Sequence, residues 1–165
     1  MLALLATVLL GCEAECQSDT RMNGDYAVQS YATSPTTDIQ GENVDAYPFP
    51  FMFWNDWSVW NLEYIASQSI IQLEIDEQPF TAEFYRAPEE CTDFTMSFAG
   101  TYLSSVGSTH SFEWSADMSY QGPHIGGVWT YQDTWTWPDE GLSGSITVPE
   151  GLISLDAGGE VEDSG

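Results

Sequence analysis

The chain has 165 residues and carries 26 Asp and Glu residues against two basic residues, Arg21 and Arg86, so its formal net charge is −24. This balance excludes nucleic acid as a partner, because phosphate binding needs clustered Lys and Arg. It also excludes electrostatic adsorption to anionic lipid. The length suits one domain, and a composition that is 42% hydrophobic and 14% aromatic predicts a folded core.

Residues 1–11 are apolar and uncharged. They are too few to span a bilayer, which needs about 20 apolar residues, and they match the hydrophobic region of a signal peptide. They lack the Lys or Arg that usually opens such a peptide. The alternative interpretation is an ordinary secreted or buried hydrophobic N-terminus.

The motif Leu9-Leu10-Gly11-Cys12 resembles the lipobox of bacterial lipoproteins, and the resemblance covers this N-terminal segment only. It implies cleavage before Cys12 and lipidation of Cys12. The protein would then be exported and anchored to the bacterial membrane, the outer membrane or cell surface being favoured over the inner membrane. Acyl chains contribute roughly 0.8 kcal/mol per buried methylene, so the membrane becomes a partner through the lipid. Residues 12–21 are then a lipidated N-terminus with a short tether.

The chain has three cysteines, Cys12, Cys16 and Cys91. If Cys12 is lipidated, as the resemblance implies, Cys16 and Cys91 remain to pair with each other. A disulfide closing so long a loop contributes about 4 kcal/mol in the chain-entropy description. The alternative is two unpaired thiols, which an oxidising compartment disfavours.

Beyond the tether, apolar and polar residues alternate in short segments, which is typical of strands with one face on a core and one in water. Tyr26 and Val28 mark the first strand. Residues 33–50 are rich in Pro, Thr and Asp and are expected to form a long loop. Residues 57–66 fit either a strand or a short helix capped by Asp56. Further strands are predicted at residues 71–76, 80–85, 94–102, 111–120, 128–137 and 142–148.

Turn residues such as those at 121–123 and 149–151 interrupt these segments. The spacing leaves no room for crossover helices, so we expect an all-β fold, an antiparallel meander of about eight strands closed as a barrel or folded as a sandwich. The β-domain spans residues 22–155, and residues 156–165 form an acidic disordered tail. Residues 22–28 resemble the opening strand of lipocalin-type barrels, which carry Gly-x-Trp where this chain has Gly24-x-Tyr26. That resemblance implies a lipocalin-like barrel.

Aromatic side chains are the most distinctive candidates for a binding site. Aromatic faces stack on sugar rings or line a ligand cavity, and the alternative is that they fill a barrel core. Asp133 interrupts an apolar strand face and needs a polar partner there. The candidate ligand-binding residues are Trp54, Trp57, Trp129, Tyr131, Asp133 and Trp135.

Catalytic and metal-binding signatures are weak. His110 and His124 flank a predicted strand pair, and we interpret them as solvated loop residues in preference to metal ligands. The sequence contains no phosphate loop, no zinc signature and no Gly-x-Ser-x-Gly elbow. We therefore expect no cofactor. The sequence has acidic segments that calcium could bind, but none of them has the ligand spacing of a calcium site. Catalytic residues are not identified, and a non-enzymatic role is favoured over an enzymatic one.

Together these features predict a lipid-anchored cell-envelope protein that binds a small apolar or aromatic-stacking ligand. The alternative is a carbohydrate-binding or carbohydrate-active surface domain that uses tryptophans as platforms. A third interpretation is an integral outer-membrane barrel, since alternating strands also suit that architecture. The sequence leaves open the ligand, the oligomeric state and whether the domain faces the periplasm or the outside.

Overall fold

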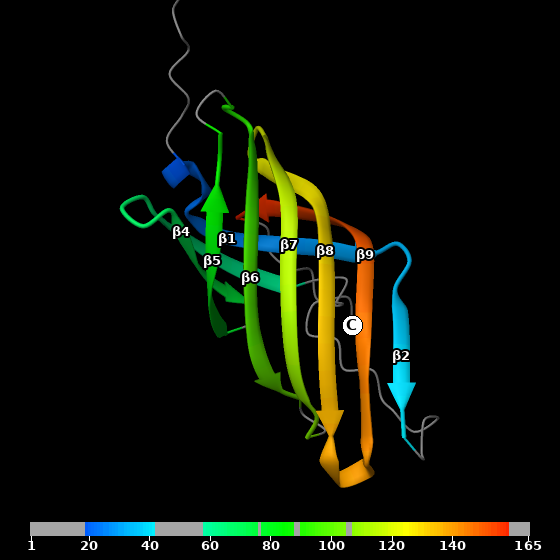
Figure 1. Cartoon of the computed structure of the whole chain (residues 1–165). Coiled ribbons are helices and arrows are strands. Elements are labelled where there is room, and N and C mark those ends of the chain that lie inside the picture. Colours follow the sequence, from blue (N-terminus) through cyan, green and yellow to red (C-terminus); the bar gives the residue numbers. More distant parts are fainter. Residues whose placement is uncertain (1–18, 42–57, 76, 88–89, 105–106, 159–165) are drawn as a thin grey trace, which may run out of the picture.

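The computed structural model describes residues 19–41, 58–75, 77–87, 90–104 and 107–158, in which nine strands are antiparallel to their neighbours (Figure 1). The strands are β1 (Gly24–Ala32), β2 (Thr36–Gln40), β3 (Ser58–Ile65), β4 (Ile70–Ile75), β5 (Gln78–Tyr85), β6 (Asp93–Leu103), β7 (Thr109–Gln121), β8 (His124–Trp137) and β9 (Leu142–Ala157). Two 3₁₀ turns, η1 (Asp19–Met22) and η3 (Pro138–Glu140), complete these elements. No helix of the described residues is long and apolar enough to cross a membrane.

The sheet closes on itself. Strands β3 to β8 each pair with the next strand in the chain, while β1 pairs with β3 on one side and with β9 on the other. The result is an eight-stranded antiparallel barrel, and β2 adds one extra strand along β9. The predicted all-β fold is confirmed. Because the sheet closes, the fold is a barrel and not a sandwich. Closure also removes the unpaired edges that open sheets expose.

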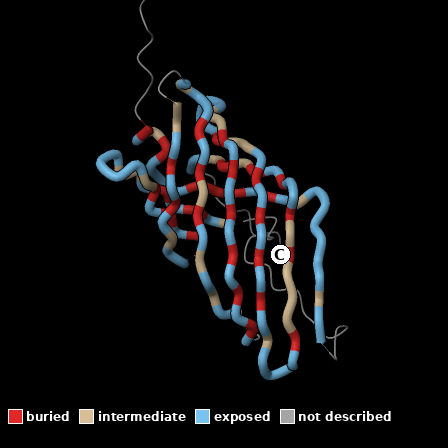
Figure 2. Tube along the Cα trace, viewed as in Figure 1, coloured by how far each residue is buried: buried red, intermediate tan, exposed pale blue. Residues whose placement is uncertain are grey.

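The alternation in the sequence becomes the two faces of the barrel wall. Along β7, buried and exposed residues alternate from Thr109 to Met118, and the same alternation of buried and exposed positions runs along the neighbouring strands in Figure 2. Aromatic rings meet across the inside: Trp114 lies 4.9 Å from Phe98 and 5.8 Å from Trp60 between ring centroids. Each such pair adds roughly 0.5–1.5 kcal/mol beyond the burial of its area.

Two predictions for the first half of the chain are settled by strand pairing. Residues 33–50 are not wholly a loop, because β2 forms at Thr36–Gln40 and pairs with Ser143–Thr147 of β9. This strand is polar and largely exposed, so it has no alternation to detect. The ambiguous segment 57–66 is a strand, β3, because it lies between β1 and β4 with its apolar side facing the core.

The predicted turn at residues 149–151 is instead a bend inside one continuous strand. The β8–β9 register shifts between Trp129 and Tyr131, opposite this bend. Before the bend β9 pairs with β2, and after it β9 pairs with β1. Pro149 lacks an N–H to donate to a ladder, so it suits a site where the pairing is interrupted. The predicted start of the tail at residue 156 is also too early, since β9 continues to Ala157 and Gly158 donates its N–H to the Asp25 carbonyl.

The 3₁₀ turn η1 packs at the end of the barrel opposite η3 (Figure 1). Asp19 forms a salt bridge of 3.0 Å with Arg86, and the Arg21 guanidinium stacks over the Tyr120 ring at 3.4 Å from its centroid. Both basic residues of the chain are therefore engaged at this end. Burial raises the pKa of the Tyr120 hydroxyl to about 12, with a smaller opposing effect from the neighbouring Arg21 guanidinium.

Candidate functional site

Four of the predicted ligand-binding residues lie on one strand and share one face. Trp129, Tyr131, Asp133 and Trp135 alternate along β8, and all four point into the barrel, each at most 4% exposed. The period of two along the strand brings them together, as the sequence predicted. They are packed against protein and not presented to water, which matches the core-filling alternative for the aromatic members.

Two of these tryptophans lie against glycines of the neighbouring strand. A Cβ at Gly151 would come within 2.2 Å of the Trp129 ring, and one at Gly144 within 2.6 Å of the Trp135 ring. The missing side chains thus let both indoles approach the backbone of β9 closely. The carbohydrate alternative needs exposed rings, and its remaining candidates, Trp54 and Trp57, lie outside the described residues, as do Cys12 and Cys16.

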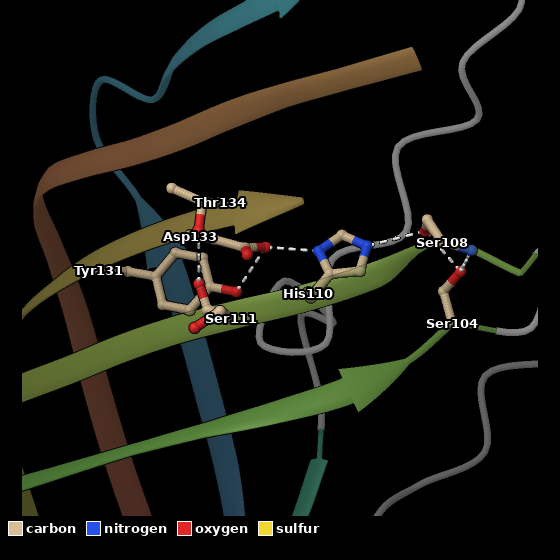
Figure 3. Close-up of polar contacts among 7 residues, drawn as sticks. All are labelled: Ser104, Ser108, His110, Ser111, Tyr131, Asp133 and Thr134. Carbon is tan, nitrogen blue, oxygen red and sulfur yellow. Dashed lines mark hydrogen bonds and ion pairs between the residues drawn. The ribbon is translucent and has the colours of Figure 1, made fainter. Parts of the chain in front are cut away.

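Asp133 has the polar partner that its position demands. His110, on the adjacent strand β7, places Nδ1 2.6 Å from Asp133 Oδ2, and the Tyr131 hydroxyl donates to the same oxygen at 3.1 Å. On the other side of the imidazole, Nε2 lies 2.8 Å from Ser108 Oγ. Figure 3 shows this chain of contacts running from β8 across β7 to the turn before it. We call Ser108, His110, Asp133 and Tyr131 the buried polar chain.

The buried polar chain extends one residue further, to Ser104. Its Oγ lies 2.6 Å from Ser108 Oγ and accepts the Ser108 backbone N–H at 3.1 Å. These contacts bind the end of β6 to the start of β7. Desolvation strongly raises the pKa of the Tyr131 hydroxyl, and the neighbouring Tyr102 and Asp133 raise it further. Tyr131 therefore stays protonated and donates.

The surroundings of the buried polar chain are aromatic. The Tyr102 ring stacks on the His110 imidazole at 4.4 Å between centroids and 10° between planes, and the Trp135 ring lies 6.4 Å away. The side chains of His110 and Asp133 have no exposed surface. Within the described part of the chain, Asp133 Oδ1 has no hydrogen-bond partner. A buried polar atom without a partner costs about 1–3 kcal/mol.

A hydroxyl, an imidazole and a carboxylate in this order form the relay of serine-dependent acyl transfer. Here the serine is inaccessible, because Ser108 is 0% exposed. The nearby backbone donors are also in use: the Gly107 N–H donates to the Ser104 carbonyl and the Ser108 N–H to the Ser104 hydroxyl. An oxyanion site needs such donors free and aimed at the substrate. The arrangement therefore suits hydrogen bonding inside the barrel, not acyl transfer.

The two histidines do not form a shared site. His110 is buried at one end of β7, whereas His124 begins β8 at the opposite end and pairs with Asp156 at the surface. The interpretation as a solvated residue holds for His124 and is wrong for His110. Among the described residues, no group of three or more His, Cys, Asp or Glu side chains is placed to hold a metal ion.

Sequence reasoning missed Ser104, Ser108 and the burial of His110. A signal for His110 was present, because it lies two residues before Phe112 and so falls on the inward face of its strand. The serines lie in the connection before β7, where no periodicity applies.

The outer wall of the barrel carries a groove of about 590 Å³, between the end of β5 and the start of β8. Its lining combines apolar side chains such as Tyr85 and Val128 with the acidic residues Glu90, Asp93 and Asp117. A volume of this size is typical of sites for small ligands.

Comparison of this chain with models of protein families, with curated proteins and with solved structures finds no match.

Proposed function

We propose that this protein is a lipid-anchored protein of the bacterial cell envelope that acts by binding a small ligand with an apolar or aromatic part, and not by catalysis. The lipid is carried by Cys12 after removal of residues 1–11. The β-barrel is the binding domain and is held close to the membrane surface.

The observation that carries this proposal is the polarity of the two faces of the wall. The inside is apolar and aromatic, whereas cross-strand neighbours on the outside are polar, as in the row formed by Ser97, Ser115 and Thr130. A barrel embedded in lipid needs the opposite arrangement, with an apolar band outside. The outer face supports a barrel that lies in water, for which a lipid on Cys12 supplies the attachment.

Contacts beside the predicted tether support a short connection between lipid and barrel. Arg21 donates from Nη2 to the Cys91 carbonyl, and Asp19 is joined to Arg86 by a salt bridge with little exposed surface. Asp19 and Arg21 therefore hold the first described residues beside Arg86 and Cys91, which supports the proposed disulfide between Cys16 and Cys91. Residues 12–18 reach at most roughly 25 Å when fully extended, so the barrel stays near the bilayer.

Binding is favoured over catalysis by the geometry of the two candidate regions. The only hydroxyl–imidazole–carboxylate arrangement among the described residues is buried and lacks free backbone donors around its serine. The outer groove, in contrast, is open to solvent and has the size of a ligand site.

Intact-mass and peptide mass spectrometry of the protein purified from a bacterial host test the anchor. We expect a mature chain that begins at Cys12 and carries the mass of a diacylglyceryl group and an amide-linked acyl chain. The variant Cys12→Ala should lose both the cleavage and the lipid, whereas the matched variant Cys16→Ala should keep them. Recovery of an unmodified Met1, or of a Cys12 without lipid, contradicts the proposal. Density-gradient separation of the membranes then assigns the protein to the outer or the inner membrane.

A further inference from the structure

The outer groove is built from two rows of residues that lie in register across neighbouring strands. In the first row Tyr85, Thr95, Asp117 and Val128 are successive cross-strand partners on β5, β6, β7 and β8. In the second row, two residues along each strand, the partners are Asp93, Ser119 and Gly126. Asp93 and Asp117 are therefore diagonal neighbours, a separation of about 7–8 Å in a sheet of this kind.

One position of the groove has no side chain of its own. Gly126 lies in the second row, and the Gln121 side chain, which also lines the groove, lies 3.3 Å from where its Cβ would be. The rim beside it is apolar and accessible: Tyr85 is 65% exposed and Val128 is 42% exposed. Apolar surface and three acidic residues, Glu90, Asp93 and Asp117, thus line the same small volume.

The chain cannot neutralise these carboxylates with its own basic side chains. Arg21 and Arg86 are its only Lys or Arg residues. Arg86 is engaged with Asp19 and with the Glu90 carbonyl, and Arg21 with the Cys91 carbonyl and the Tyr120 ring. His124 is paired with Asp156, and His110 is buried at the opposite end of β7. A cationic partner at Asp93 and Asp117 therefore does not compete with a basic side chain of the protein.

We propose that this groove binds a small cationic amphiphile, a primary amine or guanidinium attached to an aromatic or aliphatic body. The charged head would lie between Asp93 and Asp117, and the apolar body would lie along Val128 and Tyr85, whose ring face also attracts cations. A positively charged group complements the carboxylates of the groove. The apolar rim favours an organic ligand over a hydrated metal ion. The inference deepens the proposed binding function and does not depend on the lipid anchor.

The test uses two probes of matched size and opposite charge, tryptamine and indole-3-propionate, added to the ¹⁵N-labelled lipoprotein in a neutral detergent at low salt. Tryptamine should shift the amide signals of Gly126 and Gly127 in a saturable manner, and indole-3-propionate should not. Added salt should weaken the tryptamine response, because the carboxylates are exposed to solvent.

Two double variants separate the local site from the overall negative charge. Asp93→Asn with Asp117→Asn should weaken tryptamine binding roughly fivefold or more. Glu74→Gln with Glu113→Gln removes the same charge from the outer face away from this groove and should change the affinity less than about twofold. The variant Tyr85→Ser should weaken binding and leave the rest of the spectrum unchanged, because this side chain is mostly exposed.

Three results overturn the inference. They are equal responses to the two probes, equal losses in the two double variants, and no saturable glycine shift up to about 10 mM tryptamine. A negative result here with a lipidated Cys12 rejects the groove as an amine site and leaves the anchor standing. If Cys12 carries no lipid but tryptamine binds, the lipid anchor is rejected and the groove stands as an amine site.

Discussion

His110 and Asp133 are joined at 2.6 Å between Nδ1 and Oδ2, and neither side chain has any exposed surface. The pair links β7 to β8 at the end of the barrel away from η1. Taking such a pair out of water is costly, and breaking it by removal of one partner costs more, because the other is left buried without compensation. The stability of this end of the barrel therefore depends strongly on each of these two side chains.

Removal of the Asp133 carboxylate should destabilise the barrel strongly. The variant Asp133→Ala leaves the His110 ring and the Tyr131 hydroxyl without their acceptor, so we predict a loss of about 3 kcal/mol in the free energy of unfolding. Asp133→Asn keeps an acceptor oxygen and should lose less. Urea unfolding measures both, with the exposed Glu113→Gln as the control; equal stability of Asp133→Ala and the control contradicts the assignment.

Ser108 should behave as a structural residue. The variant Ser108→Ala removes the group that contacts His110 Nε2, and a loss of about 1–3 kcal/mol in the free energy of unfolding is expected. A fluorophosphonate probe should not label Ser108 in the folded wild-type protein, because the residue is 0% exposed. Labelling of Ser108 that disappears in His110→Ala would show an accessible nucleophile. That result would contradict the structural role of Ser108 and favour an enzymatic function.

Gly151 should tolerate no side chain. A Cβ at this position would lie 2.2 Å from Trp129 Cε2 and 2.5 Å from two further atoms of the same ring. The indole is buried and has no room to move aside, so Gly151→Ala should cost about 1–3 kcal/mol or prevent folding. The control is Gly126→Ala, where the nearest atom, 3.3 Å away, is the amide nitrogen of the Gln121 side chain. Thermal unfolding followed by tryptophan fluorescence distinguishes the two.

The stability of the barrel should fall at high pH. The pKa of the Tyr120 hydroxyl is raised from 10.0 to about 12 by burial, so the unfolded chain loses this proton at lower pH than the folded protein. The stabilisation is fully present below pH 10.0, decreases between pH 10.0 and about 12, and is gone above that range. Tyr26 and Tyr131, whose pKa values burial also raises, act in the same direction.

Absorbance at the tyrosinate band together with circular dichroism measures this dependence. The ionisation of the buried tyrosines Tyr26, Tyr120 and Tyr131 should coincide with unfolding. Tyr120→Phe should show a smaller decrease in stability between pH 10.0 and about 12 than the wild type. An identical decrease in the two proteins argues against Tyr120 as a source.

The proposed disulfide gives a further prediction. Peptide mapping without reductant should recover a peptide that joins Cys16 to Cys91, and reduction should lower the free energy of unfolding by about 4 kcal/mol. The variant Cys91→Ala should match the reduced protein in stability. A free thiol at both positions in the exported protein contradicts the pairing.

The strands and their inward faces were predictable because alternation is local. In β7 each apolar residue from Phe112 to Met118 faces the core, as the period of two requires. Asp133 was also recognisable from this pattern alone, as an acid on an apolar face. These inferences need only the geometry of one extended strand, which turns successive side chains to opposite sides.

Tertiary structure decided the relationships between strands. The closure of β1 onto β9, the addition of β2, the contact of His110 with Asp133 and the rows of the outer groove all depend on which strands pair and in which register. Register arises from packing over the whole barrel, and no single segment contains it. By itself the sequence determined the acidity, the predicted lipid signal and the alternating strands. Only the closed barrel placed a histidine beside the buried acid and a group of acidic residues beside an apolar rim.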